Sequence, residues 1–487
     1  MNQANKLKTI PKLSLSGAGF VLSLVCLLLP IAASAQSDQS ATANSTAQPT
    51  SAESSETQSQ LPDRSRILYI DAPVPVQEGV DPILPEPALP VEVVDEVSAQ
   101  RRVQVLRDYD LAIAAIERDG GAWDQALTEE LSALGRVQQE QGIHAEAIST
   151  LTRAMHINRI NDGLHTLAQV PVVERMIESY AAMGDWASVD LYQNYLFFVQ
   201  QKAYGSDDPR IIPVLNSLGQ WNIEAFGLGF GDPLGSRLST AQLLFNAASN
   251  MVGIHFGRND ERYVPYLRNV ANSAYLVALH PDYMSEIGRP EYVNEQELLR
   301  RKLNQAGSSE PRGFLAGLSA LEEVVDIYRE TEEEDGPVQE PYLLAEALAN
   351  LADWYLIFDR FRTAEDYYGE AWQILQETED SEELTHRLFG QVIPLPTFAN
   401  SSMNLSLGST ESMEVNELLS DYADVRLNVN QNGSPRSVEI LTEVTDENER
   451  QLSRLRREIT RGIFRPLIVE GRIEPSEGHV FRYQYWY

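Results

Sequence analysis

Apolar residues recur three and four positions apart over most of the chain, from about residue 98 to 380. Residues at this spacing lie on one face of a helix, so the pattern predicts helices that each bury one side. Short clusters of turn-forming residues separate these stretches. We therefore expect residues 98–380 to form a mainly α domain of successive helices.

Within this domain, one pattern of large and small apolar positions occurs twice with identical spacing. The copies are Leu131, Leu134, Gly135, Gln138, Ala147, Leu151 and Ala154, and then Leu348, Leu351, Ala352, Tyr355, Ala364, Tyr368 and Ala371. A weaker third copy passes through Val173, Met176, Tyr180, Gly184, Val189 and Leu196. The small residues would let two helices cross closely, and Gly142 and Gly184 fall at the expected turns.

This pattern resembles the tetratricopeptide repeat family. The resemblance implies an α-solenoid of helix pairs, whose concave faces bind proteins or peptides, with no cofactor. A further repeat is private to this chain: residues 204–215 return as residues 256–267, each opening with an aromatic residue and glycine. We interpret both copies as a helix end, a cap and the next helix. The alternative is a ligand site at Arg210 or Arg262.

The periodicity changes in residues 421–487, where apolar and polar residues alternate. Asn432-Gly433 separates two alternating runs and predicts a tight β-hairpin. Asp446 is expected to cap a helix that continues to about Gly462. A β-prone stretch, residues 479–487, closes the chain. The segment is therefore expected to be a small α+β domain with the order β-β-α-β.

This order resembles the C-terminal domain of the TonB family, whose members dock on outer-membrane receptors in the periplasm. The resemblance covers about a seventh of the chain, and the residues that carry it are Asn432-Gly433, Val438-Glu439-Ile440-Leu441, Phe464-Arg465-Pro466 and Gly471. The family binds a short partner segment as an extra strand at a sheet edge, and the resemblance implies such an edge at the final strand. The candidate partner-binding residues are Phe481, Tyr483, Gln484, Tyr485, Trp486 and Tyr487. The alternative is that these aromatic residues cover the domain's own core; alternate residues could serve both roles.

The N-terminus predicts a secretory signal peptide over residues 1–35. Three lysines precede an apolar run, and Ala33-Ser34-Ala35 fits a small-residue cleavage site. We expect cleavage rather than anchoring, and therefore a periplasmic protein without stable membrane insertion. Cys26 is the only cysteine and would leave with the signal peptide. Full TonB proteins keep a membrane anchor, so a role in energised transport does not follow from the resemblance.

The remaining segments are expected to be linkers. Residues 36–97 form a leader that is rich in Ser, Thr and Gln and then in Pro, so we expect it to be disordered or extended. Residues 381–420 are assigned as the linker between the helical and C-terminal domains. We expect those two domains to have separate cores.

Charge excludes one class of partner. The formal net charge is −33, and nearly all of it lies upstream of residue 421. Repulsion from phosphates makes nucleic acid an unsuitable partner. The acidic residues either solvate the helices or line a groove for basic partners. Proteins or peptides of the cell envelope, with an outer-membrane receptor as one possibility, are the expected partners.

No motif indicates catalysis. The seven histidines are scattered without the spacing of a helical metal site, and neither a nucleophile elbow nor a phosphate-binding loop occurs. We therefore expect no catalytic, metal or cofactor residues, and a scaffold that joins two partners. The alternative is an envelope enzyme with its active site in residues 227–311.

Overall fold

The computed structural model describes residues 69–70, 73–76, 96–281 without 232 and 261, 313–334, 341–398, and 420–486 without 447. The expected signal peptide, the Ser/Thr/Gln-rich leader and part of the 227–311 region lie outside the described residues. Within the described ranges, no helix is long and apolar enough to cross a membrane.

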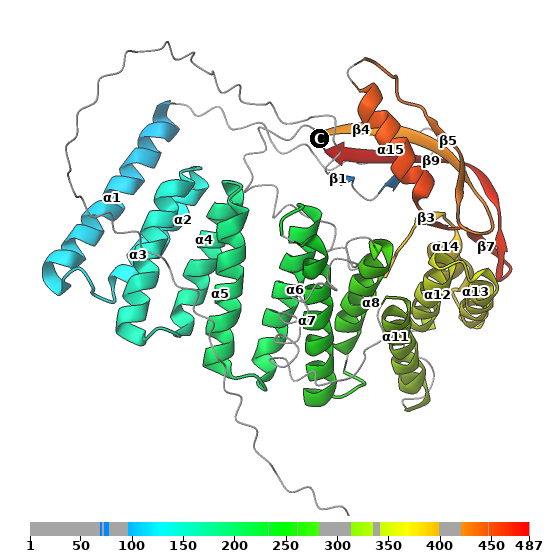
Figure 1. The fold of residues 1–487 in the computed structure, drawn as a ribbon, viewed down its shortest axis with the longest axis horizontal. Helices are drawn as coiled ribbons and strands as arrows, with labels where there is room; N and C mark the ends of the chain where they lie inside the picture. The colour runs from blue at the N-terminus through cyan, green and yellow to red at the C-terminus, as the bar shows by residue number, and fades with distance from the viewer. Residues whose placement is uncertain are drawn as a thin grey trace, which may run out of the picture. The chain divides into compact units, whose positions relative to one another are not determined.

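Consecutive helices make up most of the described chain, and each packs against the next (Figure 1). The first group is α1 (Glu96–Gly120), α2 (Leu127–Glu140), α3 (His144–Asp162), α4 (Val170–Ala182), α5 (Trp186–Tyr204), α6 (Ile212–Gly227), α7 (Leu234–His255) and α8 (Tyr263–Leu279). The second is α11 (Phe314–Glu334), α12 (Pro341–Ile357), α13 (Phe361–Gln376) and α14 (Ser381–Phe389). The expectation of a mainly α helical-repeat array is confirmed.

The small positions of the repeat pattern lie where helices cross. Ala147, Ala352 and Ala364 are fully buried. A Cβ atom added to Gly135 of α2 would lie 2.7 Å from the side chain of Leu151 in α3. The pairs α2–α3 and α12–α13 therefore cross at the positions that the sequence pattern marks, and larger side chains would push the helices apart.

The turns inside the pairs α2–α3, α4–α5 and α12–α13 share one backbone geometry. Gly142 and Gly184 have φ values of 73° and 69°, in the left-handed region. Asp359 occupies the corresponding position between α12 and α13 with φ 59°. In each turn, the next residue's N–H donates to a carbonyl five residues back, as from Ile143 to Gln138 and from Arg360 to Tyr355, both at 2.9 Å. This hydrogen bond closes the helix end.

The private repeat has the structural role expected of it. After α5, the Asp208 side chain accepts a hydrogen bond from the N–H of Arg210 and opens the short 3₁₀ helix Pro209–Ile211. Asp260 accepts the same bond from Arg262 before α8. Each arginine also pairs with its aspartate and lies over an aromatic ring at the end of the preceding helix, which is Tyr204 for Arg210 and Phe256, just after α7, for Arg262. Both arginines thus stabilise the loop in which they lie, in agreement with the structural interpretation of the repeat.

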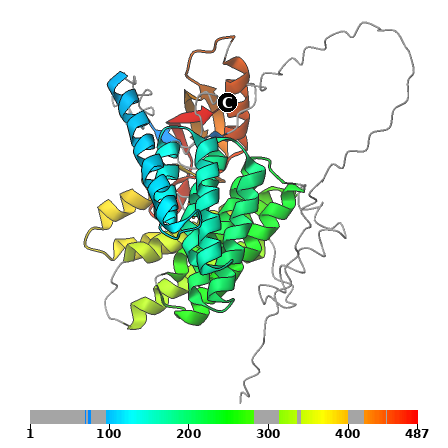
Figure 2. The same ribbon diagram turned by 90° about the vertical axis from the view of Figure 1, so that its left-hand side faces the viewer.

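The C-terminal residues form a twisted sheet with one helix lying along it (Figures 1 and 2). The elements are β4 (Ser420–Val429), β5 (Pro435–Ile440), α15 (Glu449–Arg461), β6 (Phe464–Arg465), β7 (Leu467–Val469), β8 (Arg472–Glu474) and β9 (Ser476–Trp486). The strand order is β1-β9-β4-β5, all antiparallel, with β2 also on β9. The hairpin at Asn432-Gly433 is present, and Gly433 N–H donates to Asn430 O at 2.9 Å.

The helix of this sheet starts later than expected. Asn448, rather than Asp446, precedes α15. Its side chain accepts from Thr445 N–H at 2.8 Å and donates to Glu443 O at 3.0 Å. It therefore organises the approach to the helix, which explains why the Asp446 cap is wrong. The buried face of α15 carries Leu452, Leu455 and Ile459 onto the sheet core.

Two segments assigned as linkers contribute ordered structure. The assignment of 381–420 is wrong for its first part, which contains α14 and β3 (Ile393–Pro394), the latter paired with β6. Val392 and Phe398 are buried there. The assignment of 36–97 is wrong for β1 (Tyr69–Ile70) and β2 (Val74–Pro75), which join the sheet. The strands β1, β2 and β3 were missed because they form by long-range pairing in segments of loop-like composition, whereas α14 continues the helical pattern beyond the expected boundary at residue 380.

The expectation of separate cores is also wrong. Ile468 of β7 and Ile473 of β8 are buried in one hydrophobic cluster with residues of α12 and α13. The turn of this hairpin lies against α13, where a Cβ atom on Gly471 would be 3.4 Å from the Cα of Gly369. The backbones thus touch without intervening side chains. The sheet keeps a second core of its own between its strands and α15.

A buried polar network adds to this junction. Arg465 of β6 contacts the carboxylate of Asp353 in α12 through two nitrogens. Tyr368 of α13 donates to the same carboxylate at 2.6 Å, and Thr397 donates to it at 2.5 Å. Burial, and then the Asp353 charge, raise the pKa of Tyr368, which keeps its hydroxyl a donor. Arg465 therefore holds β6 onto the helix pair α12–α13.

Candidate functional site

The final strand is not at an open edge of the sheet. On one side β9 pairs with β4 from Ser420↔Trp486 to Val429↔Ser476. On its other side it pairs with β1 and β2, which come from the opposite end of the chain. The edge that was expected to be unpaired is thus occupied by the protein's own residues at Phe481, Arg482, Tyr485 and Trp486. In Figure 1, β1 lies beside β9.

The candidate partner-binding residues divide between two faces of β9. Phe481, Tyr483 and Tyr485 are at most 4% exposed and belong to the core beneath α15. Burial raises the pKa of Tyr483. These three side chains therefore fill the domain's own core, as the alternative interpretation expected. They could contribute to partner binding only through their backbone groups.

The other candidates alternate with these. Gln484 is half-buried and lies opposite Tyr422 of β4. The backbone of Trp486 pairs with both Ser420 and Tyr69. Tyr487 lies outside the described residues. The candidates are thus brought together along one strand, and their binding role stays a prediction.

Sequence reasoning missed Arg482, which lies on the face of β9 away from the core. Its guanidinium donates to both carboxylate oxygens of Asp424 in β4 at 2.7 and 2.8 Å. Such bidentate pairs fix strand register and side-chain direction. The alternation of polar residues in both strands was the sequence signal that could have indicated this pair.

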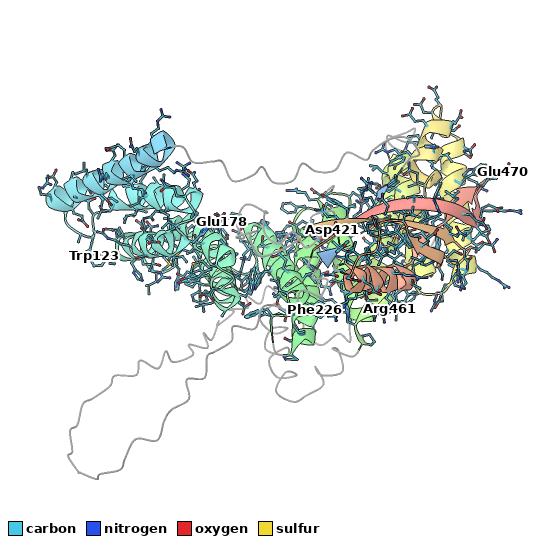
Figure 3. The ribbon with its side chains drawn as sticks, turned by 90° about the horizontal axis from the view of Figure 1, so that it is seen from above. Trp123, Glu178, Phe226, Asp421, Arg461 and Glu470 are labelled. Carbon is cyan, nitrogen blue, oxygen red and sulfur yellow. The ribbon has the colours of Figure 1, made fainter. Side chains whose placement is uncertain are left out.

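A second candidate site is a groove of about 640 Å³ in the helical array. Helix α5 lies between α4 and α6, and all three contribute to it. Its apolar part includes Leu196, Phe197 and Val214, and its polar part includes Gln200 and Ser217. Glu174 and Glu178 lie at one rim, with Glu178 labelled in Figure 3, and Arg210 lines it from the start of the 3₁₀ helix. A groove of this size accommodates a few side chains of a peptide.

Charge is unevenly distributed around this groove. Partial desolvation, and then repulsion from Glu178, raise the pKa of Glu174. At the other side, hydrogen bonds from Arg210 lower the pKa of Asp208 to about 2 and leave that arginine largely compensated. The acidic rim is therefore the less compensated side, and it favours a partner with a basic side chain.

Nothing in the described part of the chain forms a metal site, since no group of three or more potential ligands gathers there. The histidines of the array have separate surroundings: His165 contacts Phe198, and His280 contacts Phe226. Of the 227–311 region, residues 234–255 and 263–279 are the helices α7 and α8.

Comparisons with known proteins identify no family model and no curated protein that matches this chain. Among solved structures, it is similar to BtubC (BKLC) from P. vanneervenii, with 13% identity, TM-score 0.32, and coverage of 56% of this chain and 90% of that one. It is also similar to a putative kinesin light chain from Podosopora anserina with TPR-like repeats, with 13% identity, TM-score 0.32, and coverage of 54% and 97%.

Proposed function

We propose that the protein is a protein-interaction scaffold of the cell envelope. The observation that carries this is the groove between α4, α5 and α6, which combines an apolar floor with an acidic rim. Helical-repeat arrays bind peptides along such surfaces. The favoured partner in this groove is an extended or helical segment with an apolar anchor and a basic side chain.

The C-terminal sheet is the second binding part in this proposal. Its β-β-α-β order and the residues Asn432-Gly433, Phe464-Arg465-Pro466 and Gly471 support the resemblance to the TonB C-terminal domain. Strand addition at the outer edge of β9 would then hold a partner segment, such as one from an outer-membrane receptor. The function rests on binding, and we propose no catalytic step.

The proposed location is the periplasm, supported by the basic start, apolar run and Ala33-Ser34-Ala35 site of the N-terminus. Mature protein isolated from the soluble envelope fraction is expected to begin at Gln36. An intact N-terminus on membrane-bound protein would contradict this location and favour an anchored protein.

Site-specific crosslinking tests the groove. A photoreactive residue at Gln200 or Ser217 is expected to capture the same envelope protein, whereas one at the exposed Glu129 of α2 is not. Glu178→Lys should weaken that capture, because it reverses the rim charge, and Glu129→Lys serves as the control with the same charge change. Capture that is equal at all three positions, or unaffected by Glu178→Lys, would reject the groove as the binding site.

A further inference from the structure

The outer edge of β9 carries two short strands from the N-terminal part of the chain, which we call together the edge segment (residues 69–70 and 73–76). Tyr69 and Ile70 lie opposite Trp486 and Tyr485. Val74 and Pro75 lie opposite Arg482 and Phe481. The edge segment thus lies along Phe481, Arg482, Tyr485 and Trp486 of β9.

The backbone N–H groups of the edge segment point alternately toward β9 and away from it. Val76 N–H donates to Val480 O at 2.8 Å. Because backbone groups of a strand alternate in direction, Val74 also turns its N–H toward β9. Pro73 and Pro75 flank Val74, so their nitrogens point away from β9. The missing proline N–H groups therefore cost no bond to β9 and remove donors from the exposed side.

The side chains give the edge segment one anchor. Ile70 is half-buried and packs against the core beneath α15. Val74 is 37% exposed, and its partner Arg482 belongs to the opposite face of β9 from the core. Among the side chains that the structure describes in the edge segment, Ile70 is the one that packs on this core, and backbone hydrogen bonds such as that of Val76 add to it. Such an attachment is weak enough to exchange.

We propose that the edge segment is an intramolecular substitute for the partner strand, which a partner must displace. This rests on the proposed strand-addition role of the C-terminal sheet. The competing partner is an extended peptide with an aliphatic side chain in the place of Ile70 and free N–H groups in the places of Val74 and Val76. Because the edge segment belongs to the same chain, its effective concentration lowers the apparent affinity for any partner.

Peptide binding to the mature chain tests this competition. The probe is a fluorescent peptide of residues 67–78, which carries the edge segment's own sequence and needs no knowledge of the natural partner. The variants Ile70→Asp, which removes the anchor, and Val76→Pro, which removes an inward donor, should bind it at least about tenfold more tightly than the parent. Val74→Asp makes the same substitution on the other face and should leave binding at the parent's level.

Amide hydrogen exchange supplies the second readout. Exchange at residues 481–486 should become faster in Ile70→Asp and Val76→Pro, and slow again when the peptide is added. Equal peptide binding by parent and variants, or no binding by folded variants, would overturn the proposal. Because the probe is the chain's own sequence, these outcomes are independent of the groove and of any envelope partner, so failure here is distinguishable from failure of the scaffold function.

Discussion

Asp353 and Arg465 lie 112 residues apart in the chain and form a buried bidentate ion pair, with Nε–Oδ1 and Nη2–Oδ2 distances of 2.9 and 2.5 Å. Both side chains are at most 3% exposed. Additional donors and acceptors surround the pair, and Arg465 also donates to Leu388 O at 3.2 Å. The last helix pair and the C-terminal sheet are therefore joined by a desolvated charge pair whose polar atoms are well satisfied.

Removing one charge of this pair is expected to be costly. Arg465→Met should lower the free energy of unfolding by about 3–5 kcal/mol, because it leaves Asp353 buried without its partner. Chemical denaturation of the mature chain measures the loss. The control is Arg426→Met, which breaks an exposed pair with Glu439 and should cost at most about 1 kcal/mol. Similar losses in both variants would show that the buried pair is not specially important.

The helix crossing at Ala364 gives a second prediction. Ala364 of α13 is fully buried, so Ala364→Leu should destabilise the array by about 1–3 kcal/mol through overpacking. Glu365→Leu introduces the same side chain at the neighbouring exposed position and should change stability little. Thermal melting followed by circular dichroism distinguishes them. An unchanged melting temperature for Ala364→Leu would refute close packing at this crossing.

The left-handed turn positions predict opposite effects for substitutions at equivalent sites. Gly142→Ala should destabilise the α2–α3 pair by about 1–2 kcal/mol, because a Cβ atom disfavours its φ of 73°. Asp359→Gly should be neutral or stabilising by less than about 1 kcal/mol, since it relieves that cost at φ 59°. Melting temperatures of both variants against the parent check the prediction. A large loss in Asp359→Gly would mean that its side chain stabilises the turn.

Glu224 of α6 makes stability depend on pH. Burial raises the pKa of its carboxyl from 4.5 to about 7. The unfolded chain ionises this group first as pH rises, so stability falls by up to about 3 kcal/mol between pH 4.5 and 7, and the loss is complete above pH 7. Glu224→Gln should match the parent near pH 4 and be more stable at pH 8. The exposed Glu129→Gln is the control, and a difference that does not change with pH would contradict this assignment.

The prolines of the edge segment should protect against self-association. Pro73→Thr combined with Pro75→Thr restores two outward N–H groups and turns the segment into an ordinary edge strand. Sedimentation of the mature variant should then show concentration-dependent dimers or larger species, with the parent remaining monomeric under the same conditions. Val74→Thr is the control, because its N–H already faces β9. A monomeric double variant would show that the prolines do not guard this edge.

Local signals in the sequence predicted the local structure. Asn432-Gly433 specified the hairpin, since few residue pairs adopt the backbone of such a turn. The spacing of small residues such as Ala352 and Ala364 marked the helix crossings, because space at a crossing limits side-chain size. The alternation of β9 predicted both a core face and a second face, and the structure places Tyr483 and Tyr485 on the former.

Long-range pairing could not be predicted in the same way. The composition Pro73-Val74-Pro75-Val76 is typical of an extended spacer, and nothing within it indicates a partner some 400 residues later. The ion pair of Arg465 could not be predicted either. Its partner Asp353 lies within a repeat helix, where a charged residue is normally expected to face solvent. Both relationships depend on three-dimensional proximity, which one sequence does not encode locally.

The placement of Ile468 and Ile473 in the core of α12 and α13 determines the order in which this protein can mature. A chain that emerges from its N-terminus first presents both helices of the last pair well before the two isoleucines that complete their core. The core of that pair therefore remains incomplete until residues 468–473 have been synthesised. Termination before residue 468, or proteolytic loss of residues 468–487, would therefore remove Ile468 and Ile473 and expose apolar helix surface, marking such chains for quality control by proteases.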